Sequence, residues 1–238
     1  MDKAKETVHI VPIGFQSDKL IASIRQYPVH RIILITVEGD EKIEKVQKKS
    51  NDIKEAFRGI KIEERIVARE NIFQATIEIL GIIEDQIENG REVKINISGG
   101  LRNIGISSYI ASLVSKVSIY TDIPESGNDE SYVLKGVLEI PTFPIKEISQ
   151  EQLYILQKLE EGVDSLDTLI SRLKPDLKKE DPKYNNERSR LSHHIKKLKE
   201  SNFVETEKKE KNLIVNRSVL GEIYLKGIKI SNLQKREK

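Results

Sequence analysis

The sequence predicts an α/β protein in which an open, doubly wound sheet is followed by a smaller, mainly helical domain. Three observations support this fold class. Short apolar, β-branched runs alternate with helical patterns over about the first 140 residues, which indicates parallel strands joined by helices. Pro141 and Pro144 then interrupt the alternation. Beyond them, the pattern changes to helices followed by two short strands.

The first part is expected to form a Rossmann-like sheet. Its strands are recognised as short Ile- and Val-rich runs, and its helices by apolar residues at a spacing of three and four. The expected strands are 8–13, 31–37, 61–67, 92–97 and 117–120, with 131–140 as an antiparallel edge strand. The expected helices are 17–26, 41–57, 71–88 and 103–114.

The second part is expected to contain three helices and a hairpin. A capping box of Ser149 and Gln152 starts a helix over 149–161, which Gly162 ends. Further helices are expected at 165–173 and 185–201, and short strands at 203–206 and 212–216. The sequence therefore divides into a domain over 1–143 and a second over 144–238.

Composition restricts the class of protein. No apolar run is long enough to cross a bilayer and no signal peptide is recognisable, so a cytoplasmic protein without membrane contact is expected. The chain has no cysteine, which removes disulfides and thiolate chemistry. Its four histidines lack the spacing of metal ligands relative to carboxylates, so no metal site is expected.

The net charge of +2 is unevenly distributed along the chain. Residues 1–145 have an acidic excess of about three, and residues 146–238 a basic excess of about five. The uneven charge indicates that only the C-terminal part meets a polyanion.

The C-terminal order of helix, short helix, polar helix and hairpin predicts a winged helix-turn-helix that binds double-stranded DNA. In the third helix, Leu191, Ile195 and Leu198 form one apolar stripe, while the other faces are polar and basic. Arginine can pair with guanine, and the lysines of the hairpin can contact phosphate. The predicted DNA contacts are Asn185, Arg188, Ser189, Arg190, Ser192, His193, Lys196, Lys208, Lys209 and Lys211.

The segment from Ser189 to Asn216 resembles winged regulators of the MarR and ArsR type. The shared pattern is Ser189, Ser192, His194, Ile195 and Leu198, followed by Phe203 and Val204. The resemblance implies DNA binding as a homodimer, with 219–230 as a last helix at the dimer interface.

Two alternatives remain for this half of the chain. A winged helix can serve protein contacts or dimerisation alone. In addition, Arg188 and His193 have the Arg-x4-His spacing of HEPN ribonucleases, which would cleave RNA by general acid–base catalysis. The short helices and the following hairpin do not fit the helical bundle that a HEPN site requires.

In the N-terminal domain, two loops follow strands expected at the centre of the sheet. They are 13–18, with Gly14, and 96–103, with Gly99 and Gly100 followed by Arg102. Glycines let a ligand approach the backbone, and a following helix N-terminus attracts phosphate. The spacing matches neither the dinucleotide-binding nor the Walker pattern, so NAD binding and ATP hydrolysis are not supported.

The Ile-Gly-Phe and Asn-Ile-Ser-Gly-Gly-x-Arg segments resemble CARF domains, the CRISPR-associated Rossmann folds. Joined to a winged helix, they resemble the archaeal Csa-type CRISPR transcription regulators of antiviral defence. The resemblance implies a homodimer that binds a cyclic oligoadenylate, most often cyclic tetra-adenylate, as effector in one shared pocket, with no other cofactor. The ligand contacts that it implies are Gly14, Phe15, Gln16, Ser17, Asp18, Ser98, Gly99, Gly100, Leu101, Arg102 and Asn103.

A regulator of this kind is expected to have no catalytic residues and not to be an enzyme. The rival interpretations are a CARF-type ring nuclease, the HEPN-like ribonuclease, and a winged-helix regulator that has no nucleotide ligand.

Overall fold

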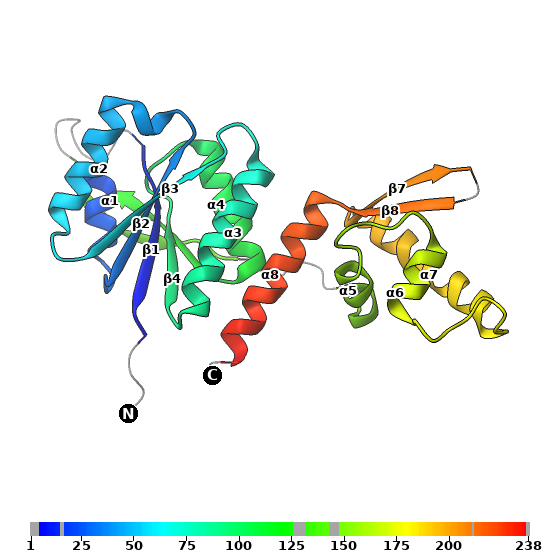
Figure 1. The fold of residues 1–238 in the computed structure, drawn as a ribbon. Coiled ribbons are helices and arrows are strands. Elements are labelled where there is room, and N and C mark those ends of the chain that lie inside the picture. Colours follow the sequence, from blue (N-terminus) through cyan, green and yellow to red (C-terminus); the bar gives the residue numbers. More distant parts are fainter. Residues whose placement is uncertain (1–4, 15–16, 126–131, 143–147, 211, 237–238) are drawn as a thin grey trace. The chain divides into compact units, whose positions relative to one another are not determined.

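The computed structural model describes the chain except for residues 1–4, 15–16, 126–131, 143–147, 211 and 237–238 (Figure 1). Its contacts divide the chain into two compact units. Unit 1 comprises Met1–Ile145 and Lys226–Lys238, and unit 2 comprises Lys146–Leu225. Pro144 of the expected boundary lies outside the described residues, and the division of the chain at 143 and 144 stays a prediction.

Unit 1 contains a six-stranded sheet in the order β3-β2-β1-β4-β5-β6. The first five strands are parallel, and β6 is antiparallel to β5. The strands are β1 (Thr7–Pro12), β2 (Arg31–Val37), β3 (Lys61–Val67), β4 (Glu92–Asn96), β5 (Ser118–Pro124) and β6 (Leu134–Glu139). The predicted Rossmann-like α/β class is therefore confirmed for this unit.

Helices cover both faces of this sheet. In Figure 1, α1 and α2 lie on one face, and α3 and α4 on the other. These helices are α1 (Ser17–Ile24), α2 (Glu44–Ala56), α3 (Ile72–Glu88) and α4 (Arg102–Ser115). The α1–α2 face has a core that includes Leu20, Leu34 and Ile53, all fully buried. Both layers explain why β1 and β2 are almost continuously apolar.

Unit 2 contains helices and a two-stranded antiparallel sheet. Its elements are α5 (Gln150–Gln157), α6 (Leu166–Leu173), α7 (Lys183–Glu200), β7 (Val204–Lys209), β8 (Asn212–Arg217) and the first part of α8 (Val219–Arg236). The capping box of Ser149 and Gln152 is confirmed at the start of α5. Val163 forms a further antiparallel bridge with Val215 of β8, which ties the α5–α6 connection to the hairpin.

Several elements differ from the predicted boundaries, and three of these differences have a local structural basis. The helix expected over 41–57 is split, because Ile43 is extended between a 3₁₀ turn (Asp40–Lys42) and α2. The helix expected over 149–161 ends at Gln157, and a turn leads to Gly162, whose φ is +65°. Finally, β7 continues through Lys209, so the hairpin turn is shorter than the expected 207–211, with Glu210 at a φ of +53°.

Candidate functional site

The loops after β1 and β4 meet at a contact between glycine backbones, which we call the glycine junction (Gly14, Gly99 and Gly100). A Cβ atom on Gly14 would lie 2.7 Å from the backbone N of Gly100. Gly100 has a φ of +84°, and a Cβ there would lie 2.7 Å from the Cβ of Pro12. Both conditions require glycine. The two glycine loops that the sequence indicated after central strands are therefore in contact, although Gly14 and Gly100 are 86 positions apart.

The glycine junction lies where the strand order reverses. β1 neighbours both β2 and β4, so the chain winds outward in opposite directions from this pair. In open α/β sheets, the crevice outside the carboxyl ends of such strands is the usual place for a ligand. The N-terminus of α4 begins at Arg102 directly after the junction, where helix N–H groups favour an anion.

Most polar side chains around the junction are already engaged within unit 1. The Ser98 hydroxyl donates to Ser23 Oγ (3.2 Å) and accepts from the backbone N–H of Asp122 (2.8 Å). Asn96 is fully buried, donates to Ser23 Oγ (2.8 Å) and accepts from the N–H of Ser98 (2.8 Å). This network fixes the loop after β4, so Ser98 holds the site rather than presenting a free hydroxyl.

Two more predicted ligand contacts are held in the same way. The Asn103 side chain donates to the backbone carbonyl of Arg69. Ser17 is buried and donates to Asp52 Oδ2 (3.0 Å), and hydrogen bonds from Lys49 and Ser17 lower the pKa of that carboxyl.

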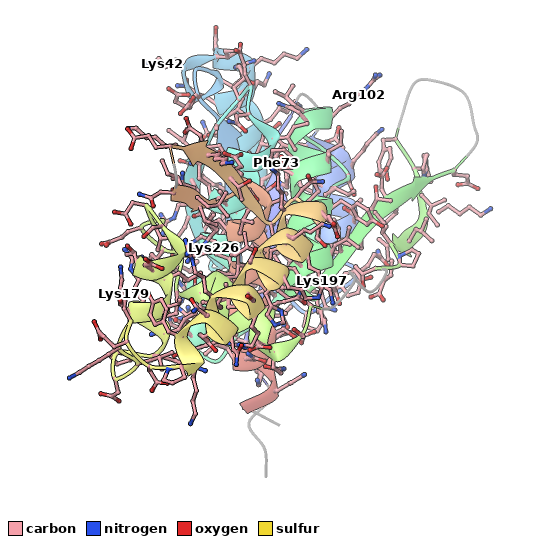
Figure 2. All side chains as sticks on the ribbon, turned by 90° about the vertical axis from the view of Figure 1, so that its right-hand side faces the viewer. Lys42, Phe73, Arg102, Lys179, Lys197 and Lys226 are labelled. Atoms are coloured by element: carbon pink, nitrogen blue, oxygen red, sulfur yellow. The ribbon has the colours of Figure 1, made fainter. Side chains whose placement is uncertain are left out.

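Arg102 is different, because it is exposed and makes no hydrogen bond or ion pair with any described residue. Figure 2 shows its side chain directed away from the end of α4 into solvent. Asp18 is also exposed, and Leu101 is half-buried. Phe15 and Gln16, two further predicted contacts, lie outside the described residues. The free cation at the junction is therefore Arg102, as far as the described residues go.

A groove of about 500 Å³ lies in unit 2 between α6, α7 and β8. The apolar stripe predicted for the third helix is confirmed, since Leu191, Ile195 and Leu198 are at most 1% exposed. The polar side of the same helix faces the groove. Its lining residues are Ser165, Leu166, Arg188, Ser189, Ser192, Asn212 and Leu213. Three of the predicted DNA contacts are thereby placed together.

Arg188 is loosely held in this groove. Its Nε lies 3.6 Å from Asp167 Oδ1, and half of its side chain is exposed. Asp167 already accepts a hydrogen bond from Lys179 Nζ at 2.9 Å. This hydrogen bond is the largest influence on the pKa of Asp167, and it lowers that pKa. The Arg188 guanidinium is therefore able to leave the carboxylate for an outside partner.

Arg190, only two residues away, lies in a different environment, in an ion cluster with α5. It donates to both oxygens of Glu187, with Nε at 3.0 Å from Oε2, and it contacts Glu151. Lys174 Nζ also bonds Glu187 at 2.8 Å, and His194 Nε2 lies 2.8 Å from Glu151. Burial first, and then the neighbouring Arg190 charge, lower the pKa of His194.

Sequence reasoning missed the acidic members of this cluster. Glu187 is only 6% exposed and precedes Leu191 by four residues, so it lies on the buried stripe of α7. This spacing of four residues in the sequence could have indicated that Glu187 is buried. A carboxylate on a buried stripe predicts a cationic partner from the same region.

The remaining predicted DNA contacts lie on exposed surfaces. They are Asn185, His193 and Lys196 of α7, and Lys208 and Lys209 of β7. Lys211 lies outside the described residues. Within the described part of the chain, no three His, Asp or Glu side chains are grouped to hold a metal ion. No helix there is long and apolar enough to cross a membrane.

The sheet order and the glycine junction at its switch point define a Rossmann-like domain, and sequence comparison assigns the domain to a family. Residues 7–127 match the family described as HFX_2341_N:-like, N-terminal. The chain belongs to this family. It is also 28% identical over 225 residues to an uncharacterized protein of Archaeoglobus fulgidus, covering 92% of this chain and 96% of that protein.

Several solved structures are similar at low identity. One is Enterococcus italicus Csm6 bound to cyclic hexa-2′-fluoro-hexa-dAMP, with 12% identity, a TM-score of 0.45, and coverage of 84% of this chain and 57% of Csm6. Another is Can2 from Sulfobacillus thermosulfidooxidans in complex with cyclic tetra-adenylate, with 14% identity, a TM-score of 0.44, and coverage of 96% and 63%. The chain thus spans less than two thirds of either protein.

A further similar structure is a type III CRISPR defence DNA nuclease activated by cyclic oligoadenylate. Its identity is 12%, its TM-score is 0.40, and the match covers 86% of this chain and 36% of the nuclease. Our prediction that the protein is not an enzyme is contradicted by this similarity to a nuclease.

Proposed function

We propose that this protein is a CRISPR-associated CARF protein that binds double-stranded DNA through a winged helix in residues 144–238, under the control of a cyclic oligoadenylate bound by residues 1–143. The observation that carries the proposal is the arrangement of α7. Its apolar stripe is buried, while Arg188, Ser189 and Ser192 face a polar groove that Asn212 of β8 also lines. A recognition helix beside a wing has this arrangement.

In the proposed complex, the exposed side of α7 enters the major groove. Arg188 is the base-reading residue, because a guanidinium can donate two parallel hydrogen bonds to guanine. Ser189 and Ser192 contact phosphate or base edges, and Lys208 and Lys209 of the wing contact the backbone. Arg190 is left out of this set, since Glu187 and Glu151 already engage its guanidinium.

In unit 1, the ligand approaches the backbone at the glycine junction. The backbone contact of Gly14 with Gly100 fixes the two loops, the N-terminus of α4 supplies N–H groups, and Arg102 supplies a cation that has no ion-pair partner among the described residues. The resemblance of these two loops to CARF domains gives the ligand class, a cyclic oligoadenylate such as cyclic tetra-adenylate. In a homodimer, two junctions would face one ring across the two-fold axis.

The coupling between the two functions follows from dimer geometry. Two recognition helices enter successive major grooves only when they lie roughly 34 Å apart. A ligand that binds one relative orientation of the subunits better than another therefore changes DNA affinity, by as much as its affinities for the two orientations differ.

The test of the DNA proposal is selection of binding sites from a random duplex library, followed by titration of the selected duplex. We expect Arg188→Ala to weaken binding about tenfold, as for a lost guanine contact. Arg58→Ala, an exposed arginine of unit 1, is the control. If no duplex is enriched, or if Arg188→Ala binds the selected duplex as the wild type does, the DNA proposal is wrong.

The test of the ligand proposal is calorimetric titration with cyclic tetra-adenylate, with linear tetra-adenylate as control. One ring per two chains, and weaker binding by Arg102→Ala, are expected. The same mixtures, with DNA and RNA added, are run on denaturing gels, and any cleavage product would assign an enzymatic activity. Absence of ring binding would contradict the sensor proposal and leave the DNA result to be judged by itself.

A further inference from the structure

The end of β5 is hydrogen-bonded to the loop after β4, which contains Gly99 and Gly100. The backbone N–H of Asp122 donates to the Ser98 hydroxyl at 2.8 Å, and Ser98 is the second residue of that loop. Since β4 and β5 are parallel neighbours, Asp122 lies on the carboxyl side of the sheet, as the glycine loops do. None of the residues predicted to contact ligand comes from this strand.

Tyr132 is anchored to this point just before β6 begins. Its hydroxyl donates to Asp122 Oδ2 at 2.9 Å. Lys19, in the first turn of α1, places its Nζ 5.7 Å from the centroid of the Tyr132 ring. Burial, and after it the Asp122 carboxylate, raise the pKa of Tyr132, so the phenol keeps its proton and the hydrogen bond at neutral pH.

The result is a partly exposed aromatic ring held by its hydroxyl end, with a cation over its face, on the side of the sheet where the glycine loops and the N-terminus of α4 lie. Single-stranded nucleic acids are bound by this combination, in which basic groups contact the phosphates and aromatic side chains stack on the bases. A hydrogen bond at the far end of the ring fixes its plane at little entropic cost when a base arrives.

We propose that Tyr132 stacks on an adenine base of the cyclic nucleotide and that Asp122 acts as a positioning residue, which holds both Tyr132 and the Ser98 loop. This inference rests on the proposed sensor function of unit 1. It adds Tyr132, two residues before β6, to the two glycine loops as a third contact with the ligand, and it assigns Lys19 to the neighbouring phosphate.

The chain contains no tryptophan, which allows a direct test. In the full-length Tyr132→Trp variant, the only indole would lie where the base is expected to stack. We expect cyclic tetra-adenylate to quench its emission with the same midpoint as the calorimetric titration. Tyr154→Trp, at an exposed tyrosine of α5, is the matched control and should not respond.

Affinity provides the second measurement. Stacking of about 1–3 kcal/mol per base corresponds to a loss of roughly 5- to 150-fold in the Tyr132→Ala variant. Tyr132→Phe keeps the ring and should lose less than Tyr132→Ala. Unchanged emission from Tyr132→Trp with ring bound, or wild-type affinity in Tyr132→Ala, would overturn this inference alone. A wild-type protein that binds no ring would overturn the sensor proposal, and this inference with it.

Discussion

The two candidate sites are built from different parts of the chain. At the glycine junction, the defining contact is between backbone atoms, and the side chains of Ser98 and Asn103 are engaged within unit 1. In the groove of unit 2, side chains form the surface, and Ser189 and Ser192 are exposed. The junction therefore depends on conformations that only glycine allows, whereas the groove should tolerate substitution without loss of fold.

The largest effect is expected for Gly100→Ala at the junction. The new Cβ would meet Pro12, and an L-residue is strained at a φ of +84°. We expect a loss of about 2–4 kcal/mol in the free energy of unfolding, measured by urea denaturation of unit 1. Gly105→Ala in α4 is the control, because nothing lies within 4 Å of its new Cβ. That variant should gain about 0.5–1 kcal/mol from helix propensity.

If Gly100→Ala is as stable as the wild type, the loops after β1 and β4 do not meet as described. The contrast between a backbone site and a side-chain site would then be lost. If Gly105→Ala is equally destabilised, the effect belongs to α4 as a whole and not to the junction.

A smaller loss of stability is expected for Arg190→Ala, which tests the ion cluster of unit 2. Its removal leaves the buried carboxylate of Glu187 with Lys174 as its remaining ion-pair partner among the described residues. We expect a loss of about 2 kcal/mol in the stability of unit 2, below the cost of a fully uncompensated buried charge. Arg188→Ala should change stability by less than about 0.5 kcal/mol, since its guanidinium is half-exposed and weakly paired.

These two arginines separate stability from DNA binding. In thermal unfolding, we expect Arg190→Ala to lose more stability than Arg188→Ala. In titration with the selected duplex, we expect Arg188→Ala to lose more affinity than Arg190→Ala. If Arg190→Ala unfolds like the wild type and loses DNA affinity, the ion cluster is not its main role, and Arg190 belongs with the DNA contacts.

The fold of unit 1 was predictable because strands buried on both faces leave long apolar runs, as in β2, and glycines mark the loops that follow. Individual contacts were less predictable. The pairing of Arg190 with Glu151 required knowing which face of α7 meets α5, and the bond between Ser98 and Asp122 joins the loop after β4 to β5 through a side chain. Such contacts depend on register and rotamer, which periodicity does not encode.

The extended Ile43 shows the same limit at the level of helix boundaries. Apolar spacing continues across the 3₁₀ turn into α2, so periodicity predicts one helix where the structure has two segments. The interruption coincides with the Asp40–Arg69 ion pair, a tertiary contact that a local pattern does not contain.

The last expected effect is a pH dependence of stability, and it concerns the buried His9 of unit 1. His9 is fully buried, its Nε2 bonds the Pro28 carbonyl at 3.0 Å, and its Nδ1 lies 2.7 Å from the Tyr120 hydroxyl. A carbonyl only accepts, so Nε2 carries the proton and Nδ1 accepts from Tyr120. Burial is the largest influence and lowers the pKa of His9 below 6.5. His194 of unit 2 differs from His9, because its ring is partly exposed and its Nε2 lies 2.8 Å from Glu151 Oε2, a carboxylate that can pair with the protonated ring.

Below pH 6.5, an unfolded chain binds a proton at His9 that the folded chain does not, so acid favours unfolding. We expect the stability of unit 1 to fall between pH 6.5 and 5.5 by at most about 1.4 kcal/mol from this residue, until the folded-state pKa is reached. Urea denaturation at both pH values should show the dependence in the wild type and in His193→Gln, whose ring is exposed. It should be reduced in His9→Gln, and an unchanged dependence there would mean that His9 is charged in the folded protein.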